Sequence, residues 1–272
     1  MHTSPIFIGC QSKSGTSLLR TIIGRHPNIF GGDGFETHWF SQEIIGGDWE
    51  NNQTQRQKWL KDWYEINDQD YHMLKKTSTS GIDFFDRFMT FCTNREGKKR
   101  WLEKTPDNLY HYNLINQNWP DVKFIHGVRE FKDIYSSWKA NKLGSLKTLT
   151  VHDFVQKVRH SYQQIEHLLG RTTENYIETK YEDLVNEPRS AILRVLDFVD
   201  ESYIDGMENY IGDSDEFSKV KEIMGVESNT SRSLQKPIFT SSVGQWSKIL
   251  TKDEIVTIDE SLGDLREKLG YK

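Results

Sequence analysis

A short apolar run near the N-terminus leads directly into a loop rich in glycine and hydroxyl side chains, and this junction constrains the fold more than any other feature. Ile6-Phe7-Ile8 has the composition of a buried strand. Apolar residues then recur at helical spacing at Leu18, Leu19, Ile22 and Ile23. A strand joined so closely to a helix is typical of the unit that opens a parallel sheet.

The same alternation of apolar runs and helical periodicity continues along the chain. Further strands are expected at Val122–Val128 and Tyr176-Ile177, and helices around Ile134 and Trp138, over 151–169, from Pro188, and from the capping box of Thr251 and Glu254. The pattern predicts one α/β domain spanning residues 1–272, similar to P-loop proteins, with a central parallel β-sheet flanked by helices on both faces.

Residues 46–100 interrupt this alternation. The stretch is polar and rich in tryptophan, with Trp59 and Trp63 about one helical turn apart. No Pro/Ser-rich linker or repeat separates it from the rest of the chain. We therefore expect an insertion within the single domain, placed where it would form a lid or a wall beside a binding site.

Composition narrows the functional class. The chain has 35 Lys+Arg against 40 Asp+Glu and a net charge of −5, so it lacks the basic surface that nucleic-acid binding needs. No apolar run approaches ~18 residues, and no signal-peptide pattern precedes the first strand. Two cysteines match no zinc spacing, and the histidines show no metal-ligand spacing. These features predict a cytoplasmic enzyme without a metal site and without nucleic-acid or membrane partners; they predict no oligomeric state.

The loop after the first strand has the composition of an anion site. It runs from Gly9 to Ser17 and carries Lys13, and its backbone N–H groups and the following helix dipole would favour negative charge. The Gly-Lys-Ser/Thr triplet of nucleotide triphosphatases is replaced here by Ser14-Gly15-Thr16. A Mg²⁺-dependent kinase or nucleotidase is therefore disfavoured, but it remains the alternative at this point.

The segment Lys13-Ser14-Gly15-Thr16-Ser17, followed by Leu18-Leu19-Arg20 and His26-Pro27, closely resembles the phosphosulfate loop of sulfotransferases that use 3′-phosphoadenosine 5′-phosphosulfate (PAPS). The resemblance implies that Lys13, Ser14, Gly15, Thr16 and Ser17 bind the 5′-phosphosulfate. It also implies that Lys13 assists departure of the phosphate from the sulfuryl group, without a metal.

Two further stretches resemble donor-binding motifs of the same family. Arg129 follows the strand Lys123–Val128, and Ser137 lies eight residues later, matching the two positions that bind the 3′-phosphate. Arginine suits this role because its planar fork of donors fits a phosphate. Tyr181, in Tyr181-Glu182-Asp183-Leu184, matches the tyrosine that lies against the adenine ring.

The C-terminal region resembles the segment that closes over the donor. Lys236 and Trp246 match donor-binding positions there, and Ser231 matches the transition-state serine of the tyrosylprotein branch. That branch has a lysine just before the tryptophan, where this chain has Gln245.

The proton acceptor has two candidates, Glu36 and His38. Small-molecule sulfotransferases carry a catalytic histidine in a Lys-Thr-His-type segment, but this chain has Glu103-Lys104-Thr105-Pro106 there. Glu36 instead matches the glutamate base of the tyrosylprotein and heparan branches, so we assign Glu36 first and His38 second. Lys104 matches the lysine that stabilises the sulfuryl oxygens.

The resemblance, which is closest to the tyrosylprotein and heparan branch, implies sulfuryl transfer from PAPS to a hydroxyl or amine, with 3′,5′-ADP as the second product. We expect a small-molecule acceptor, of the kind modified in natural-product biosynthesis. A peptide tyrosine acceptor, the Mg²⁺-dependent kinase or nucleotidase, and a binding module without activity are the alternatives.

Overall fold

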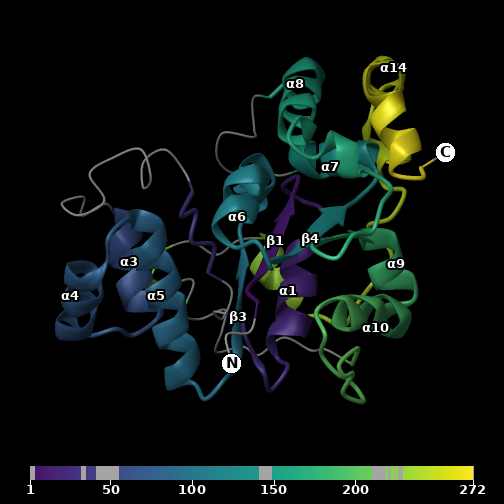
Figure 1. Cartoon of the computed structure of the whole chain (residues 1–272). Helices are drawn as coiled ribbons and strands as arrows, with labels where there is room; N and C mark the ends of the chain where they lie inside the picture. Colours follow the sequence, from purple (N-terminus) through teal and green to yellow (C-terminus); the bar gives the residue numbers. More distant parts are fainter. Residues whose placement is uncertain are drawn as a thin grey trace.

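The computed structural model describes residues 4–31, 35–40, 55–140, 149–209 and 229–271, together with positions 219, 222, 223 and 225. Its centre is a five-stranded sheet with the order β2-β3-β1-β4-β5, in which every pairing is parallel (Figure 1). The strands are β1 Ile6–Cys10, β2 Ile29–Phe30, β3 Arg100–Lys104, β4 Lys123–Val128 and β5 Tyr176–Lys180. β1 lies between β3 and β4, so the sheet extends from β1 in both directions. The loop after β1 therefore lies at the switch point in strand order, where ligands bind in sheets of this kind.

Alternating side chains along each strand supply two separate hydrophobic cores. Phe7, Phe124 and Tyr176 belong to one core, and their neighbours Ile6, Ile125 and Ile177 belong to the other. Successive side chains of a strand point to opposite faces, so both faces of the sheet are covered.

Helices cover both faces of the sheet (Figure 1). The face with Ile6 packs against α1 Thr16–Gly24 and α10 Pro188–Phe198, and α9 Tyr181–Asn186 contributes Leu184 to the same core. The opposite face packs against residues of η2 Pro106–His111, α6 Tyr112–Asn118, α7 Phe131–Ala140, α8 Val151–Tyr162, η4 Glu166–Leu168 and α14 Lys252–Lys268. The remaining C-terminal helices are α12 Asn229–Leu234 and α13 Trp246–Ile249.

The predicted fold class is confirmed, as are the strands expected near Ile6, Val122 and Tyr176 and the capping box at the start of α14. Two strands were not predicted, β2 and β3. The helix expected over 151–169 ends at Tyr162 and is followed by the short η4.

The described part of the expected insertion forms α3 Gln55–Trp63, α4 Asp68–Thr77 and α5 Gly81–Arg95, at one side of the molecule in Figure 1. Phe84, Phe85 and Phe88 of α5 are buried, and the ring of Phe85 lies 5.7 Å from the ring of Trp101 on β3. These helices therefore extend the core beside β2 and β3, and residues 46–54 lie outside the described residues. The lid over the acceptor remains a prediction.

Among the described residues, no helix is both long enough and apolar enough to cross a bilayer.

Candidate active site

The loop between β1 and α1 has a backbone suited to surrounding an anion. Lys13 and Gly15 both have φ of +78°, and the Ser14 N–H donates to the Gln11 carbonyl at 3.1 Å. Gly15 is the N-cap of α1, so the first-turn N–H groups of that helix face the loop without a side-chain cap. The buried hydroxyl of Ser14 has no hydrogen-bond partner within the described residues. This hydroxyl is therefore available to a bound molecule.

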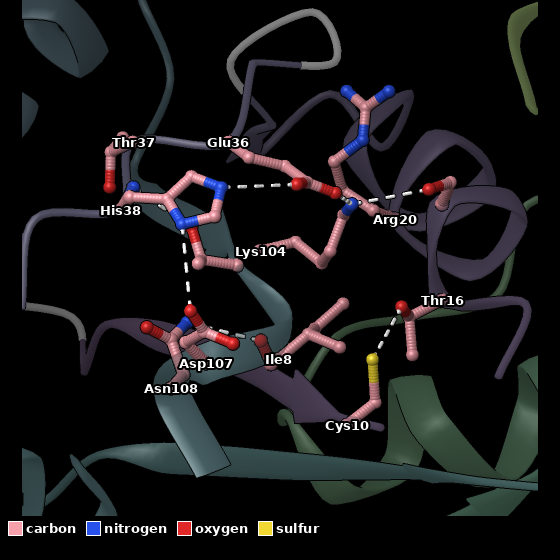
Figure 2. A network of polar contacts seen from close by, with 12 residues as sticks. Ile8, Cys10, Thr16, Arg20, Glu36, Thr37, His38, Lys104, Asp107 and Asn108 are labelled. Carbon is pink, nitrogen blue, oxygen red and sulfur yellow. Dashed lines mark hydrogen bonds and ion pairs between the residues drawn. The ribbon is translucent and has the colours of Figure 1, made fainter. Parts of the chain in front are cut away.

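The loop is held in place by contacts with α7 and α8. Trp138 on α7 donates its ring N–H to the Ser12 carbonyl at 3.0 Å, and Gln11 donates to the Ser161 hydroxyl on α8. The hydroxyl of Thr16 lies 3.0 Å from the thiol of Cys10 (Figure 2). The Cys10 side chain therefore supports the start of α1.

A second cationic group lies against the same loop. Arg129, just after β4, donates to the Lys13 carbonyl at 3.0 Å and to the Ser242 carbonyl at 2.7 Å. Its guanidinium lies 4.4 Å from the centre of the Tyr181 ring, and the Tyr181 hydroxyl is 2.6 Å from that of Ser242. The buried Nε of Arg129 has no partner within the described residues. The structure thus places two predicted donor-binding residues, Arg129 and Tyr181, in contact.

The position of the Tyr181 ring requires glycine at position 15, as does the positive φ of that residue. A Cβ at position 15 would lie 2.1 Å from Cδ2 of Tyr181. The absence of a side chain lets the tyrosine ring pack directly on the loop, so the two anion-binding elements form one continuous site.

The predicted base and the predicted sulfuryl-binding lysine form an ion pair (Figure 2). Lys104, at the end of β3, donates to Glu36 and also to the Ser17 hydroxyl at 3.1 Å, and its side chain is only 2% exposed. Burial alone would raise the pKa of Glu36, but Lys104 and His38 outweigh it and hold that pKa well below its usual range. Burial lowers the pKa of Lys13; Glu36 opposes this shift and Lys104 adds to it. Lys13, Ser17, Glu36 and Lys104 therefore belong to one charged cluster at the start of α1.

His38 occupies a left-handed backbone conformation, with φ of +47°. Its Nε2 lies 3.4 Å from Glu36 and its Nδ1 lies 3.8 Å from Asp107, while its backbone N–H donates to the Thr105 hydroxyl. The imidazole therefore lies between two carboxylates (Figure 2), and both candidate bases remain within one site.

Glu103, for which the sequence predicts no role, holds the segment that carries Glu36. The Glu103 carboxylate is buried and accepts from the Thr37 N–H at 3.3 Å, the Thr37 hydroxyl at 2.9 Å, the Thr105 hydroxyl at 2.6 Å and the Asn108 amide at 2.6 Å. The sequence contains the hydroxyl and amide donors of Thr37, Thr105 and Asn108, but nothing in it indicates that they bind one carboxylate.

The C-terminal segment is held to α7 by a single carboxylate. Asp133 accepts from the N–H of Gly244 at 2.7 Å and from the N–H of Trp246 at 3.1 Å. The ammonium of Lys132 lies 4.5 Å from the centre of the Trp246 ring. This attachment brings Ser242 over Arg129, so the segment that closes on the predicted donor site is anchored.

The remaining predicted residues lie outside these contacts. Ser137 is half-buried on α7, and Lys236 is exposed after α12. Ser231 belongs to α12, but its side chain lies outside the described residues. No group of three or more metal-ligating side chains is found within the described part of the chain.

The fold and the site together define a P-loop-like α/β domain in which the predicted anion-binding loop lies beside an arginine–tyrosine pair. A model of the sulfotransferase family matches residues 5–205. The chain belongs to this family.

Curated relatives include protein-tyrosine sulfotransferase A of Caenorhabditis elegans, which is 22% identical over 99% of this chain and 68% of the relative. The protein-tyrosine sulfotransferase of Drosophila melanogaster is 24% identical, and the match covers 98% of this chain and 51% of that protein.

Two solved structures share the fold. One is a sulfotransferase domain from the curacin biosynthetic pathway, with a TM-score of 0.66 and 18% identity over 99% of this chain and 98% of that one. The other is the sulfotransferase domain of the Synechococcus PCC 7002 olefin synthase, with a TM-score of 0.61 and 21% identity over 95% of both chains.

Proposed function

We propose that the protein transfers the sulfuryl group of PAPS to a hydroxyl or amine of a small-molecule acceptor, with Glu36 as general base. The observation that carries this proposal is the single cluster of Lys13, Ser17, Glu36 and Lys104 at the start of α1. Anion-binding donors and a carboxylate base meet there, as in-line transfer to a neutral nucleophile requires. Membership of the sulfotransferase family supports this reaction over a Mg²⁺-dependent kinase or nucleotidase.

The residues fit PAPS at both of its charged ends. The orphan hydroxyl of Ser14 and the N-terminus of α1 suit the 5′-phosphosulfate. Arg129, which now donates to carbonyl oxygens, can form charge-assisted bonds with the 3′-phosphate, and the predicted adenine-contacting residue Tyr181 lies against it. When bound, PAPS supplies an activated sulfuryl group.

Lys104 links donor binding to base strength. In the structure it neutralises Glu36, which makes that carboxylate a weak base. If its ammonium turns toward sulfuryl oxygens, Glu36 loses a strong partner and its proton affinity rises. Glu36 then takes the proton from the acceptor oxygen while that oxygen forms its bond to sulfur. The bond from sulfur to the 5′-phosphate oxygen breaks, and Lys13 stabilises the charge on the departing 3′,5′-ADP.

A peptide tyrosine is the second candidate acceptor. It is favoured by the names of the curated relatives, which are protein-tyrosine sulfotransferases. The two solved domains come from curacin and olefin biosynthesis, which is the reason to test pathway-type small molecules first. A cytoplasmic location and a role in natural-product biosynthesis remain predictions.

Transfer of label from [³⁵S]PAPS in EDTA tests the proposed function, using a panel of phenols, alcohols, amines and tyrosine peptides. We expect labelled product from a small molecule, and far less from Glu36→Gln. Tight binding of 3′,5′-ADP without transfer to any acceptor would instead indicate a binding module.

A further inference from the structure

A cavity of about 530 Å³ lies between η2 and α8, outside the residues assigned to donor binding. Its volume falls within the range of small-molecule sites. Its lining comes mainly from η2, through Asp107, Tyr110 and His111, and from α8, through Asp153, Gln156, Lys157 and His160, with Leu149 just before α8.

Two chains of contacts connect this cavity to the charged cluster. On one side, Asp107 lies 3.8 Å from His38, and His38 lies 3.4 Å from Glu36 (Figure 2). On the other side, Gln11 of the anion-binding loop donates to the Lys157 carbonyl at 3.5 Å. The cavity therefore lies one contact from His38 and one from Gln11, and its Asp107 is linked to Glu36 through His38, which places the cavity near the proposed base.

The cavity has more carboxylates than ammonium groups. Asp107 and Asp153 contribute two carboxylates from opposite walls, and Lys157 contributes one ammonium. Burial lowers the pKa of His111, so that imidazole stays neutral. The Asp107 side chain is 54% exposed, and Asp153 uses Oδ2 for its bonds to Thr150, which leaves Oδ1 as an acceptor. Both carboxylates can therefore accept hydrogen bonds from a ligand.

We propose that this cavity binds the acceptor and selects small hydroxyl compounds that carry a protonated amine. This inference rests on the proposed function and names its substrate class. Carboxylates stabilise an ammonium, so they raise the pKa of a bound amine and prevent it from acting as a nucleophile. The amine is then the group that is recognised, and the hydroxyl is the group that loses its proton to Glu36 and forms the bond to sulfur.

Matched phenols test this selectivity. Tyramine and 4-ethylphenol differ by the amine, and N-acetyltyramine retains the chain without the charge. We expect kcat/KM for tyramine to exceed that for each neutral analogue by at least about tenfold, the effect of one favourable charge contact of about 1.4 kcal/mol. Asp107→Asn should lower this ratio several-fold, whereas Asp121→Asn, an exposed carboxylate outside the cavity, should leave it unchanged. The ratio cancels any general loss of turnover caused by the contact of Asp107 with His38.

A binding measurement separates failure of this inference from failure of the proposed function. Calorimetry on protein saturated with 3′,5′-ADP should show tyramine binding more tightly than 4-ethylphenol, and Asp107→Asn should remove the difference. Equal affinities or equal kcat/KM values, or no binding of either phenol, would overturn the acceptor class. Loss of 3′,5′-ADP binding would instead overturn the proposed function.

Discussion

Replacing Glu36 with glutamine separates donor binding from catalysis. The substitution retains the size of the side chain and removes the charge that Lys104 neutralises. A general base contributes about 10²–10⁴-fold to a rate, so we expect turnover to fall by that factor in an assay with [³⁵S]PAPS. Affinity for 3′,5′-ADP should be unchanged or higher, because Lys104 no longer has the carboxylate as a competing partner.

The same variant has a predictable cost in stability. Lys104 is 2% exposed and loses its anionic partner, but Glu36 is 34% exposed, so solvent screens part of the pair. We expect the free energy of unfolding to fall by about 1–3 kcal/mol, between the values for surface and buried pairs. The depressed pKa of Glu36 stabilises the fold fully above its usual value of 4.5, and this contribution is lost as pH falls further toward the folded pKa. The deficit of the variant measured by urea unfolding should therefore shrink below about pH 4.5.

His38→Gln is the matched control, because it removes the other candidate base from the same segment. We expect a smaller loss of turnover than in Glu36→Gln. A fully active Glu36→Gln enzyme together with an inactive His38→Gln enzyme would refute the reasoning and assign the base role to His38.

Other predictions concern residues that shape the site. Gly15→Ala should weaken 3′,5′-ADP binding at least tenfold by calorimetry, because its Cβ would overlap the Tyr181 ring and its φ is +78°; unchanged affinity would contradict this packing. Glu103→Gln should retain 3′,5′-ADP binding but lower kcat, since an amide cannot accept all four hydrogen bonds; loss of both together would indicate a purely structural role. Asp133→Asn should increase proteolysis near Trp246, because the carboxylate accepts two N–H groups there; an unchanged cleavage rate would show that other contacts hold the segment.

Local patterns were sufficient for β1, β4 and β5 and for the loop that follows β1, whereas the two residues of β2, Ile29 and Phe30, are too few to form a pattern. β3 was missed because Arg100, Glu103 and Lys104 are charged and yet buried. Two of them have partners distant in sequence, since Lys104 pairs with Glu36 and Arg100 donates to the Val199 carbonyl at 2.5 Å. A hydrophobicity pattern assigns such residues to solvent, so only the folded chain reveals the strand.

The candidate site likewise contains features that local sequence patterns predict and contacts that only the fold creates. Lys13 and its loop were indicated by composition next to a strand, because backbone geometry and charge act locally there. The contact of Arg129 with Tyr181 joins the ends of two strands, and resemblance to a family predicted both residues without predicting that they touch. The cavity beside Asp107 depends on how η2 and α8 pack, which no local pattern encodes.

Calorimetric titration with 3′,5′-ADP in EDTA tests most directly whether both anion-binding elements hold one nucleotide. We expect 3′,5′-ADP to bind the wild-type protein saturably. Binding to both Lys13→Ala and Arg129→Ala should be at least about tenfold weaker, since a charge-assisted bond contributes about 1.5–3 kcal/mol. Lys268→Ala, which removes an exposed lysine paired with Glu166, should bind normally. Wild-type affinity in both Lys13→Ala and Arg129→Ala would contradict the account.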